Sequence, residues 1–161
     1  DISKFQEDGL IDINFLDPAG LAKTLGYEPT FINDTIVERD MRDFPRLYIL
    51  NKTKTQLATL YFHYGYGHNE VSEISVRYIQ APRKFPQQPE VLKVEQFVSS
   101  KGIHLGMGLK DVLVKFGEPS ETSRVAMMYC ISYQQKGGLY YGNYYFENDK
   151  LVFFEFGDVY P

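Results

Sequence analysis

The 161-residue chain contains one cysteine, Cys130, and no tryptophan. A lone cysteine cannot form an intramolecular disulfide, so the stability of the core has to come from packing. Cys130 lies in the apolar run Met127–Ile131. A buried thiol behaves as a small hydrophobic group, and no activating base or electropositive neighbour accompanies this one in the sequence. We therefore expect Cys130 to be structural.

Long apolar runs and an excess of positive charge are also missing. No hydrophobic stretch approaches the roughly 20 residues that span a bilayer. The formal net charge is −4, without the clustered lysines and arginines that neutralise phosphates. We expect no transmembrane segment and no nucleic-acid partner. The chain starts at Asp1 without a signal peptide, as a processed mature domain would.

Local catalytic and cofactor motifs are absent from the sequence. It has no phosphate-binding loop, no GxGxxG pattern and no serine–histidine–aspartate spacing. We expect a non-catalytic protein without a cofactor. A hydrolase whose site is assembled across the fold is the enzymatic alternative, because such a site leaves no local motif.

His63, His68 and Glu70 are grouped around a glycine-rich turn. A metal site needs three or four converging ligands. We place His63 on the outward face of a strand and His68 in the turn, so the two histidines are not set up to converge. The sequence favours solvated turn residues and no metal.

Tyrosine and phenylalanine are abundant, with 13 and 12 residues respectively. Both residue types favour half-buried, pleated surfaces, and several runs alternate apolar with polar residues. Short turns connect some of these runs, as in antiparallel hairpins. The expected strands are Arg46–Asn51, Leu57–Tyr64, Val71–Ile79, Lys93–Val98, Met127–Tyr133, Leu139–Glu147 and Leu151–Phe156.

The stretch Gly102–Ser120 predicts a short amphipathic helix. Its apolar residues Leu109, Val112, Leu113 and Phe116 fall at the spacing of one helix face. Gly108 occupies the capping position and Gly117 the position after the last turn, and Pro119 prevents the helix from continuing.

A weaker copy of this helix is expected near the N-terminus. Asp17 can cap the first free N–H groups, and Pro18 occupies the first helical position. Gly26 marks the end, and Pro29 prevents resumption.

The two halves of the chain correspond in order, with Arg46–Asn51 matching Met127–Ser132. We therefore predict an α+β fold of two tandem repeats, each a short helix packed on an antiparallel meander of three or four strands. The first repeat covers residues 1–80, a proline-rich linker covers 81–92, and the second repeat covers 93–161.

The run from Gly102 to Met107, with Val112 and the Gly117–Pro119 stop, resembles a signature of bacterial envelope lipoproteins of the SmpA/OmlA (BamE-like) kind. The tandem layout is similar to that of β-lactamase-inhibitory protein. The resemblance implies a secreted, periplasmic or cell-envelope protein. Gly108 stands where these families have a capping serine or threonine. No residue of the inhibitory surface can be matched here, so inhibition of a β-lactamase does not follow.

Alternation along the strands predicts an aromatic face directed away from the helices. Tyrosine and arginine are common at binding hot spots, so this face is the candidate site for a protein partner. The alternatives are a small-ligand or carbohydrate site that uses the same rings for stacking, and a face that a second layer covers. The candidate partner-binding residues are Tyr61, His63, Arg77, Tyr141, Tyr145 and Phe153.

Overall fold

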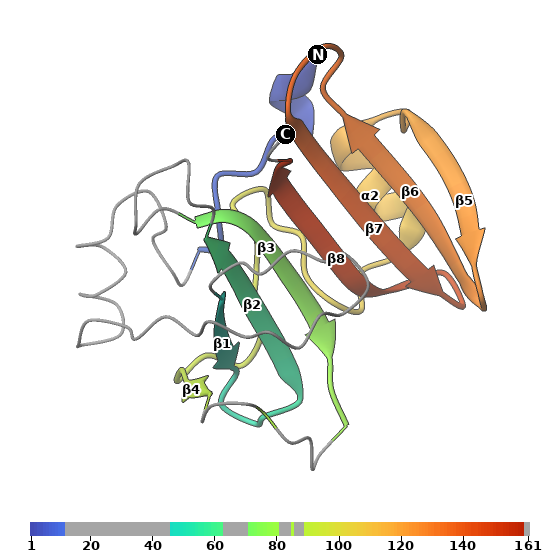
Figure 1. Ribbon diagram of the computed structural model, residues 1–161. Helices are drawn as coiled ribbons and strands as arrows, with labels where there is room; N and C mark the ends of the chain where they lie inside the picture. The colour runs from blue at the N-terminus through green and yellow to red at the C-terminus, as the bar shows by residue number, and fades with distance from the viewer. Residues whose placement is uncertain (12–45, 63–70, 81–84, 86–88, 160–161) are drawn as a thin grey trace.

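The computed structural model describes residues 1–11, 46–62, 71–80, 85 and 89–159 (Figure 1). Within these residues the chain forms one short 3₁₀ helix, one α-helix and eight strands. They are η1 (Ile2–Lys4), β1 (Arg46–Leu50), β2 (Gln56–Phe62), β3 (Val71–Tyr78), β4 (Glu90–Val91), α2 (Leu109–Phe116), β5 (Glu121–Val125), β6 (Met128–Gln134), β7 (Tyr140–Glu147) and β8 (Lys150–Asp158).

All eight strands belong to one sheet in the order β4-β1-β2-β3-β8-β7-β6-β5. The short strand β4 runs parallel to β1, and the other neighbours are antiparallel. The sheet contains two meanders, β1-β2-β3 and β6-β7-β8, that lie side by side through β3 and β8 (Figure 1).

The predicted α+β class, with two tandem helix-on-meander repeats, is wrong. The described residues are mostly β and contain a single α-helix, and the meanders merge into one mixed sheet. The cause is that β3 and β8 each end a meander with an open edge of unpaired peptide groups. Pairing them along five residues, from Glu73↔Gly157 to Arg77↔Phe153, satisfies both edges at once. The helix expected near Asp17 lies outside the described residues, and the division at residues 81–92 stays a prediction.

The local predictions came close to the observed elements. Six of the expected strands correspond to β1, β2, β3, β6, β7 and β8. Helix α2 begins after Gly108 and ends before Gly117, as predicted. The strand expected at Lys93–Val98 is wrong, since only an isolated bridge joins Val98 to His104 there. Strand β5 was missed because its sequence, ETSRV, carries almost no apolar signal.

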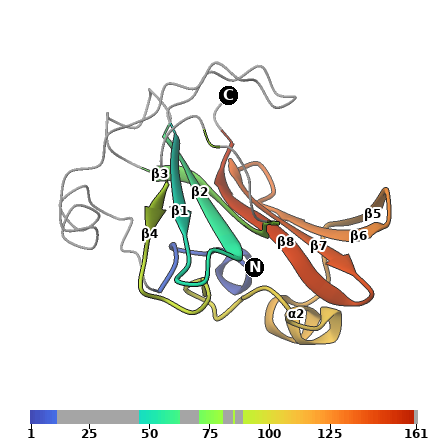
Figure 2. The same cartoon turned by 90° about the horizontal axis from the view of Figure 1, so that it is seen from below.

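The sheet bends around its core. Helix α2 and the N-terminal segment lie on the same side of the sheet, and both are visible below it in Figure 2. Buried side chains from both meanders pack there with residues that precede α2. The largest fully buried side chains of this core are Tyr133, Tyr144, Phe97, Phe146, Phe154, Ile49, Leu60, Ile103, Ile131 and Leu151. Leu57 is also fully buried, but it packs with Tyr48 and Leu50 on the opposite face of the sheet.

Alternation in the sequence predicts inward side chains at Ala58, Leu60, Ile74, Val76, Tyr78, Tyr144, Phe146, Val152, Phe154 and Phe156, and all of these but two are buried. Tyr78 is 47% exposed because it ends β3 at the margin of the core. Val152 is only half-buried, because the β7–β8 register shifts between Tyr145 and Phe146, and Leu151 is fully buried instead.

Tyr144 supplies a testable stability prediction, because its buried hydroxyl has no hydrogen-bond partner among the described residues. An unpaired buried hydroxyl is unfavourable, so Tyr144→Phe should raise the free energy of unfolding by about 1 kcal/mol. Tyr133→Phe is the matched control: its hydroxyl donates to Gly117 O at 2.8 Å, so it should lose about 1 kcal/mol. Urea unfolding measures the change in the free energy of unfolding for each variant. A Tyr144→Phe variant that is less stable than the wild type would contradict this account.

Candidate functional site on the sheet face opposite α2

The predicted partner-binding residues lie on the sheet face opposite α2, which faces the viewer in Figure 1. Tyr61 is in β2, Arg77 in β3, Tyr141 and Tyr145 in β7, and Phe153 in β8, and all five are half-buried. His63 lies outside the described residues. We call this surface the aromatic sheet face, defined by Tyr61, Glu73, Arg77, Tyr141, Tyr145, Phe153 and Glu155.

The register explains how tyrosines from separate strands share this face. Glu73 on β3 pairs with Gly157 on β8, and Gly157 pairs with Tyr141 on β7. Gly157 has no side chain, so Tyr141 reaches across β8, and its hydroxyl donates to Glu73 Oε1 at 2.7 Å. This hydrogen bond links the two meanders on the surface.

A second polar pair lies two residues further along β7, on the same face. Asn143 Nδ2 donates to Glu155 Oε1 at 3.0 Å, from β7 to β8. Burial raises the pKa of Tyr141 far above its usual value, and the nearby carboxylates of Glu155 and Glu73 raise it further. Burial likewise raises the pKa of Tyr145, with Glu155 adding to the effect. The phenols therefore stay protonated and act as hydrogen-bond donors.

A third pair of side chains on this face is aromatic. Tyr145 and Phe153 are cross-strand neighbours with ring centroids 5.0 Å apart and ring planes at 38°. Arg77 is the partner of Phe153 in the β3–β8 register. An aromatic pair beside an arginine is typical of a hot spot in a protein interface.

The outer end of the face carries a cation–π contact. The Arg46 guanidinium carbon lies 5.3 Å from the centre of the Tyr61 ring, across the β1–β2 pair. Burial raises the pKa of Tyr61, while the charge of Arg46 lowers it. Tyr61 is thereby held between Arg46 and Glu73, its register partner on β3.

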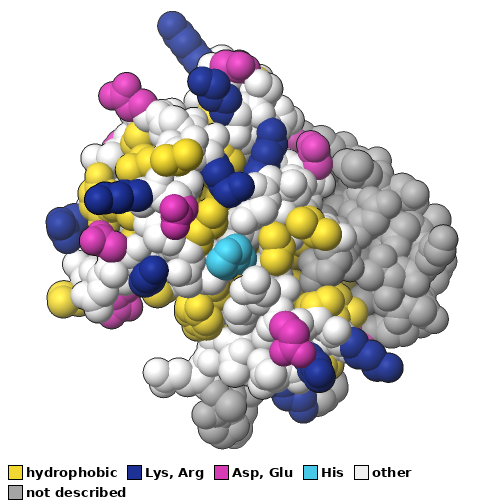
Figure 3. Space-filling view, turned by 180° about the vertical axis from the view of Figure 1, so that it is seen from behind, with side chains coloured by type: hydrophobic (Ala, Val, Ile, Leu, Met, Phe, Trp, Pro, Cys, Tyr) yellow, Lys and Arg dark blue, Asp and Glu magenta, His cyan; other side chains and the backbone are white. Residues whose placement is uncertain are grey.

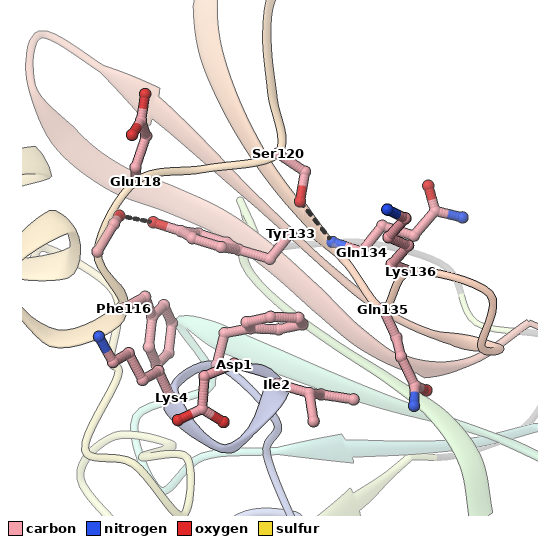
Figure 4. Close-up of a pocket in the computed structure, with 12 residues that line it drawn as sticks. Asp1, Ile2, Lys4, Phe116, Glu118, Ser120, Tyr133, Gln134, Gln135 and Lys136 are labelled. Atoms are coloured by element: carbon pink, nitrogen blue, oxygen red, sulfur yellow. Dashed lines mark hydrogen bonds between the residues drawn. The ribbon is translucent and has the colours of Figure 1, made fainter.

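A pocket of about 500 Å³ lies on the other side of the molecule, between η1, the end of α2 and the end of β6. Figure 4 shows its lining, with Ser120 Oγ accepting a hydrogen bond from Gln134 N at 3.1 Å. Its aromatic residues are buried and pack on each other: the Phe5 and Phe116 ring centroids each lie 5.4 Å from that of Tyr133. The accessible lining is therefore more polar than apolar, and its three rings are mostly covered by their neighbours.

A second pocket, of about 190 Å³, lies beside Glu7 and Tyr140. Neither pocket is lined by Tyr61, Arg77, Tyr141, Tyr145 or Phe153.

Glu7 is a buried carboxylate that fastens the N-terminal segment to the loop before α2. Ser99 Oγ donates to its Oε1 at 2.6 Å, and Ser100 Oγ and Lys101 N donate to its Oε2 at 2.7 and 2.8 Å. Its own N–H donates to the Tyr140 hydroxyl at 2.6 Å. Burial raises the pKa of Glu7, and these hydrogen bonds only partly offset the effect.

Glu7 should make the stability of the protein depend on pH. Because its pKa is higher in the folded than in the unfolded state, its contribution favours folding below about pH 4.5. That contribution is lost as the pH rises through the folded-state pKa. The free energy of unfolding of the wild type minus that of Glu7→Gln should therefore fall as the pH increases from 4 to 7. Urea unfolding across this range measures the difference, and a flat or rising curve would contradict it.

His104 is the one histidine among the described residues. His104 Nδ1 lies 2.9 Å from the carbonyl oxygen of Leu105. His68 and Glu70 lie outside the described residues. Within the described ranges no three histidine, cysteine or acidic side chains are grouped so that they could hold a metal ion.

The most exposed large apolar side chains are not on the aromatic sheet face. Ile11, Val114 and Met127 are 69%, 84% and 82% exposed. Figure 3 views the molecule from the α2 side and shows hydrophobic side chains at the surface among lysine, arginine and acidic residues. Single exposed apolar residues are ordinary, so they do not define a site by themselves.

The hydrogen bonds that organise the aromatic sheet face were not predicted from the sequence. Glu73, Asn143 and Glu155 were assigned outward positions by alternation, but their hydrogen-bond partners depend on the pairing of distant strands. Gly157 was missed altogether. A glycine between the aromatic run Phe153–Phe156 and Asp158 was the available signal for a close approach of another strand.

Comparisons of the chain with protein-family models, with curated proteins and with solved structures found no match. No helix in the described part of the chain is long and apolar enough to cross a membrane.

Proposed function

We propose that this protein is a non-catalytic interaction module that binds a protein partner through the aromatic sheet face. The observation that carries the proposal is the pairing of Tyr145 with Phe153, 5.0 Å apart and half-buried, next to Arg77. Rigid aromatic rings give a large contact area at low entropic cost, and arginine adds directional hydrogen bonds.

The surrounding network supports a protein partner because it holds the face in one arrangement. Tyr141 is tied to Glu73, and Asn143 to Glu155, so the polar groups are fixed before binding. Preorganised side chains lose little freedom when a partner docks. The half-buried side chains of the face lie on β2, β3, β8 and β7, whereas Leu57, Thr59 and Ser75 on the same face are buried. Contacts spread over four strands suit a protein partner rather than a small ligand.

We place the protein in a secreted, periplasmic or cell-envelope setting. The support is the resemblance of Gly102–Met107, Val112 and Gly117–Pro119 to envelope lipoproteins of the BamE-like kind.

Affinity capture from native extracts tests the main proposal. The test variant is Tyr145→Ala/Phe153→Ala, which removes the aromatic pair. The matched control is Val114→Ala/Met127→Ala, which removes apolar side chains that are exposed elsewhere. The wild type and the control should retain the same partner, and the test variant should lose it. Equal retention by both variants would overturn the proposal.

The 500 Å³ pocket favours a second candidate function, the binding of a small polar ligand, because its volume is in the range of ligand sites. Ligand-observed NMR with a library of polar metabolites tests it, with Lys136→Glu as the variant in the pocket. Binding that Lys136→Glu leaves unchanged would count against this pocket.

A further inference from the structure

Strand β5 forms an open edge of the sheet. All five of its residues, Glu121–Val125, are exposed, and within the described chain it pairs only with β6. The opposite edge, β4, is protected differently: it has two residues and follows Pro89. Strand β5 has no proline, its two charges are of opposite sign, and no other described segment pairs with its outer side, so its free peptide groups are a template for another strand.

The turn after β5 determines which peptide groups point outward. Ala126 and Met127 form a two-residue turn with Ala126 at φ 55°, so Val125↔Met128 is the hydrogen-bonded closing pair. Hydrogen-bonded and non-bonded pairs alternate along an antiparallel ladder. The N–H and C=O groups of Ser123 and Glu121 therefore face β6, and those of Thr122 and Arg124 face solvent.

The side chains of β5 carry a charge pattern that an added strand would meet. Arg124 lies on the α2 side of the sheet, with its guanidinium carbon 5.7 Å from the centre of the Tyr129 ring. Glu121 and Val125 lie on the opposite side, because side chains alternate along a strand. The edge thus presents a cation near one end, an anion at the other and an apolar residue at the turn.

We propose that β5 binds an extended, antiparallel segment of a partner protein by strand addition. Its peptide groups bond to those of Thr122 and Arg124, and its charges complement the edge. Read from its N-terminus, the segment carries an apolar residue opposite Val125 and an acidic residue opposite Arg124. A small residue, a β-branched residue and a basic residue then stand opposite Ser123, Thr122 and Glu121. Direct cross-strand pairs of this kind favour one register over others.

A second copy of this chain fits the edge less well. A two-fold axis through Ser123 would bring Arg124 diagonally next to the Arg124 of the other copy, on the same face.

A synthetic peptide tests the proposal directly. Its core is valine–glutamate–threonine–valine–lysine, capped at both ends, and the control peptide has the glutamate and lysine exchanged. NMR titration of the full chain should shift the amide signals of Glu121–Val125 with the first peptide. The exchanged peptide should bind at least tenfold more weakly, because both charge pairs become repulsive.

Two variants separate strand addition from other binding. Thr122→Pro removes an outward N–H and leaves the β5–β6 ladder intact, so affinity should fall at least tenfold. Glu121→Lys/Arg124→Glu should reverse the preference between the two peptides, and it keeps the result decisive if the proline variant does not fold. Failure of the first peptide to bind, or an unreversed preference, overturns the proposal.

The same variants also test whether a second copy occupies β5 and whether the aromatic sheet face takes part in peptide binding. Sedimentation that shows a wild-type dimer, lost in Thr122→Pro, would make a second copy the occupant and overturn the choice of a partner segment. Tyr145→Ala/Phe153→Ala should bind the peptide like the wild type, since these residues are on β7 and β8 and β6 separates them from the free edge of β5. Loss of peptide binding in that variant would contradict the proposed site on β5.

Discussion

Gly157→Ala should lower the free energy of unfolding by about 3–5 kcal/mol, the largest effect expected of any single methyl group in this protein. A Cβ at this position would collide with the Ser72 carbonyl oxygen and lie 2.6 Å from Glu73 Cα, both backbone atoms of β3. The φ of 148° adds strain for any residue with a side chain. Relief requires β3 and β8 to separate, which breaks the pairing that joins the two meanders. Urea unfolding followed by circular dichroism measures the loss.

Gly137→Ala is the matched control for the backbone term. Gly137 also has a positive φ, 69°, but a Cβ there meets nothing within 4 Å. Gly137→Ala should therefore lower the free energy of unfolding by only about 1 kcal/mol. A Gly157→Ala variant that is no less stable than Gly137→Ala would show that β3 and β8 are not packed as closely as described.

Asn51→Ala should lower the free energy of unfolding by about 3 kcal/mol, because one fully buried amide satisfies several backbone groups. Asn51 Oδ1 accepts from Thr55 N at 2.9 Å and Gln56 N at 2.8 Å, and Nδ2 donates to Glu95 O at 2.7 Å. Alanine leaves all three groups without this partner. The same amide thus closes the β1–β2 turn and fastens the segment that follows β4.

Thr53→Ala provides the comparison for Asn51. Its exposed hydroxyl also bonds to Asn51 Nδ2, at 3.0 Å, so the variant removes one peripheral contact of the same network. The loss should stay below about 1 kcal/mol because water can replace an exposed hydroxyl. Thermal unfolding of the two variants gives the difference, and equal losses would show that the three buried hydrogen bonds of Asn51 contribute no more than the exposed one.

Gly157 also affects the arrangement of the aromatic sheet face. Tyr141 on β7 bonds to Glu73 on β3 across Gly157, which is the register partner of both. A Cβ at Gly157 would lie 3.0 Å from Glu73 Cγ, so it would disturb the side chain that accepts this hydrogen bond. The geometry of the aromatic sheet face and the stability of the sheet therefore depend on the same glycine.

Most single elements could be predicted from the sequence because their signals are local. The period of the apolar residues from Leu109 to Phe116, bounded by Gly108 and Gly117, defines α2. Alternation in β7 separates buried Tyr144 from half-buried Tyr145, since neighbouring side chains of a strand point to opposite faces. Both signals act within a few residues and do not depend on the rest of the chain.

The tertiary structure decided which strands meet, and there the prediction of two separate repeats failed. Strands pair through backbone N–H and C=O groups, which are the same at every open edge. The side chains of β3 and β8 therefore do not indicate that these two edges pair with each other. Strand β5 escaped prediction for a related reason: it is held by the backbone of β6 rather than by buried side chains. The sequence by itself determined the elements and the two faces of each strand. The single sheet, the role of Gly157 and the open edge at β5 came only from long-range backbone pairing, which leaves no periodic trace in the sequence.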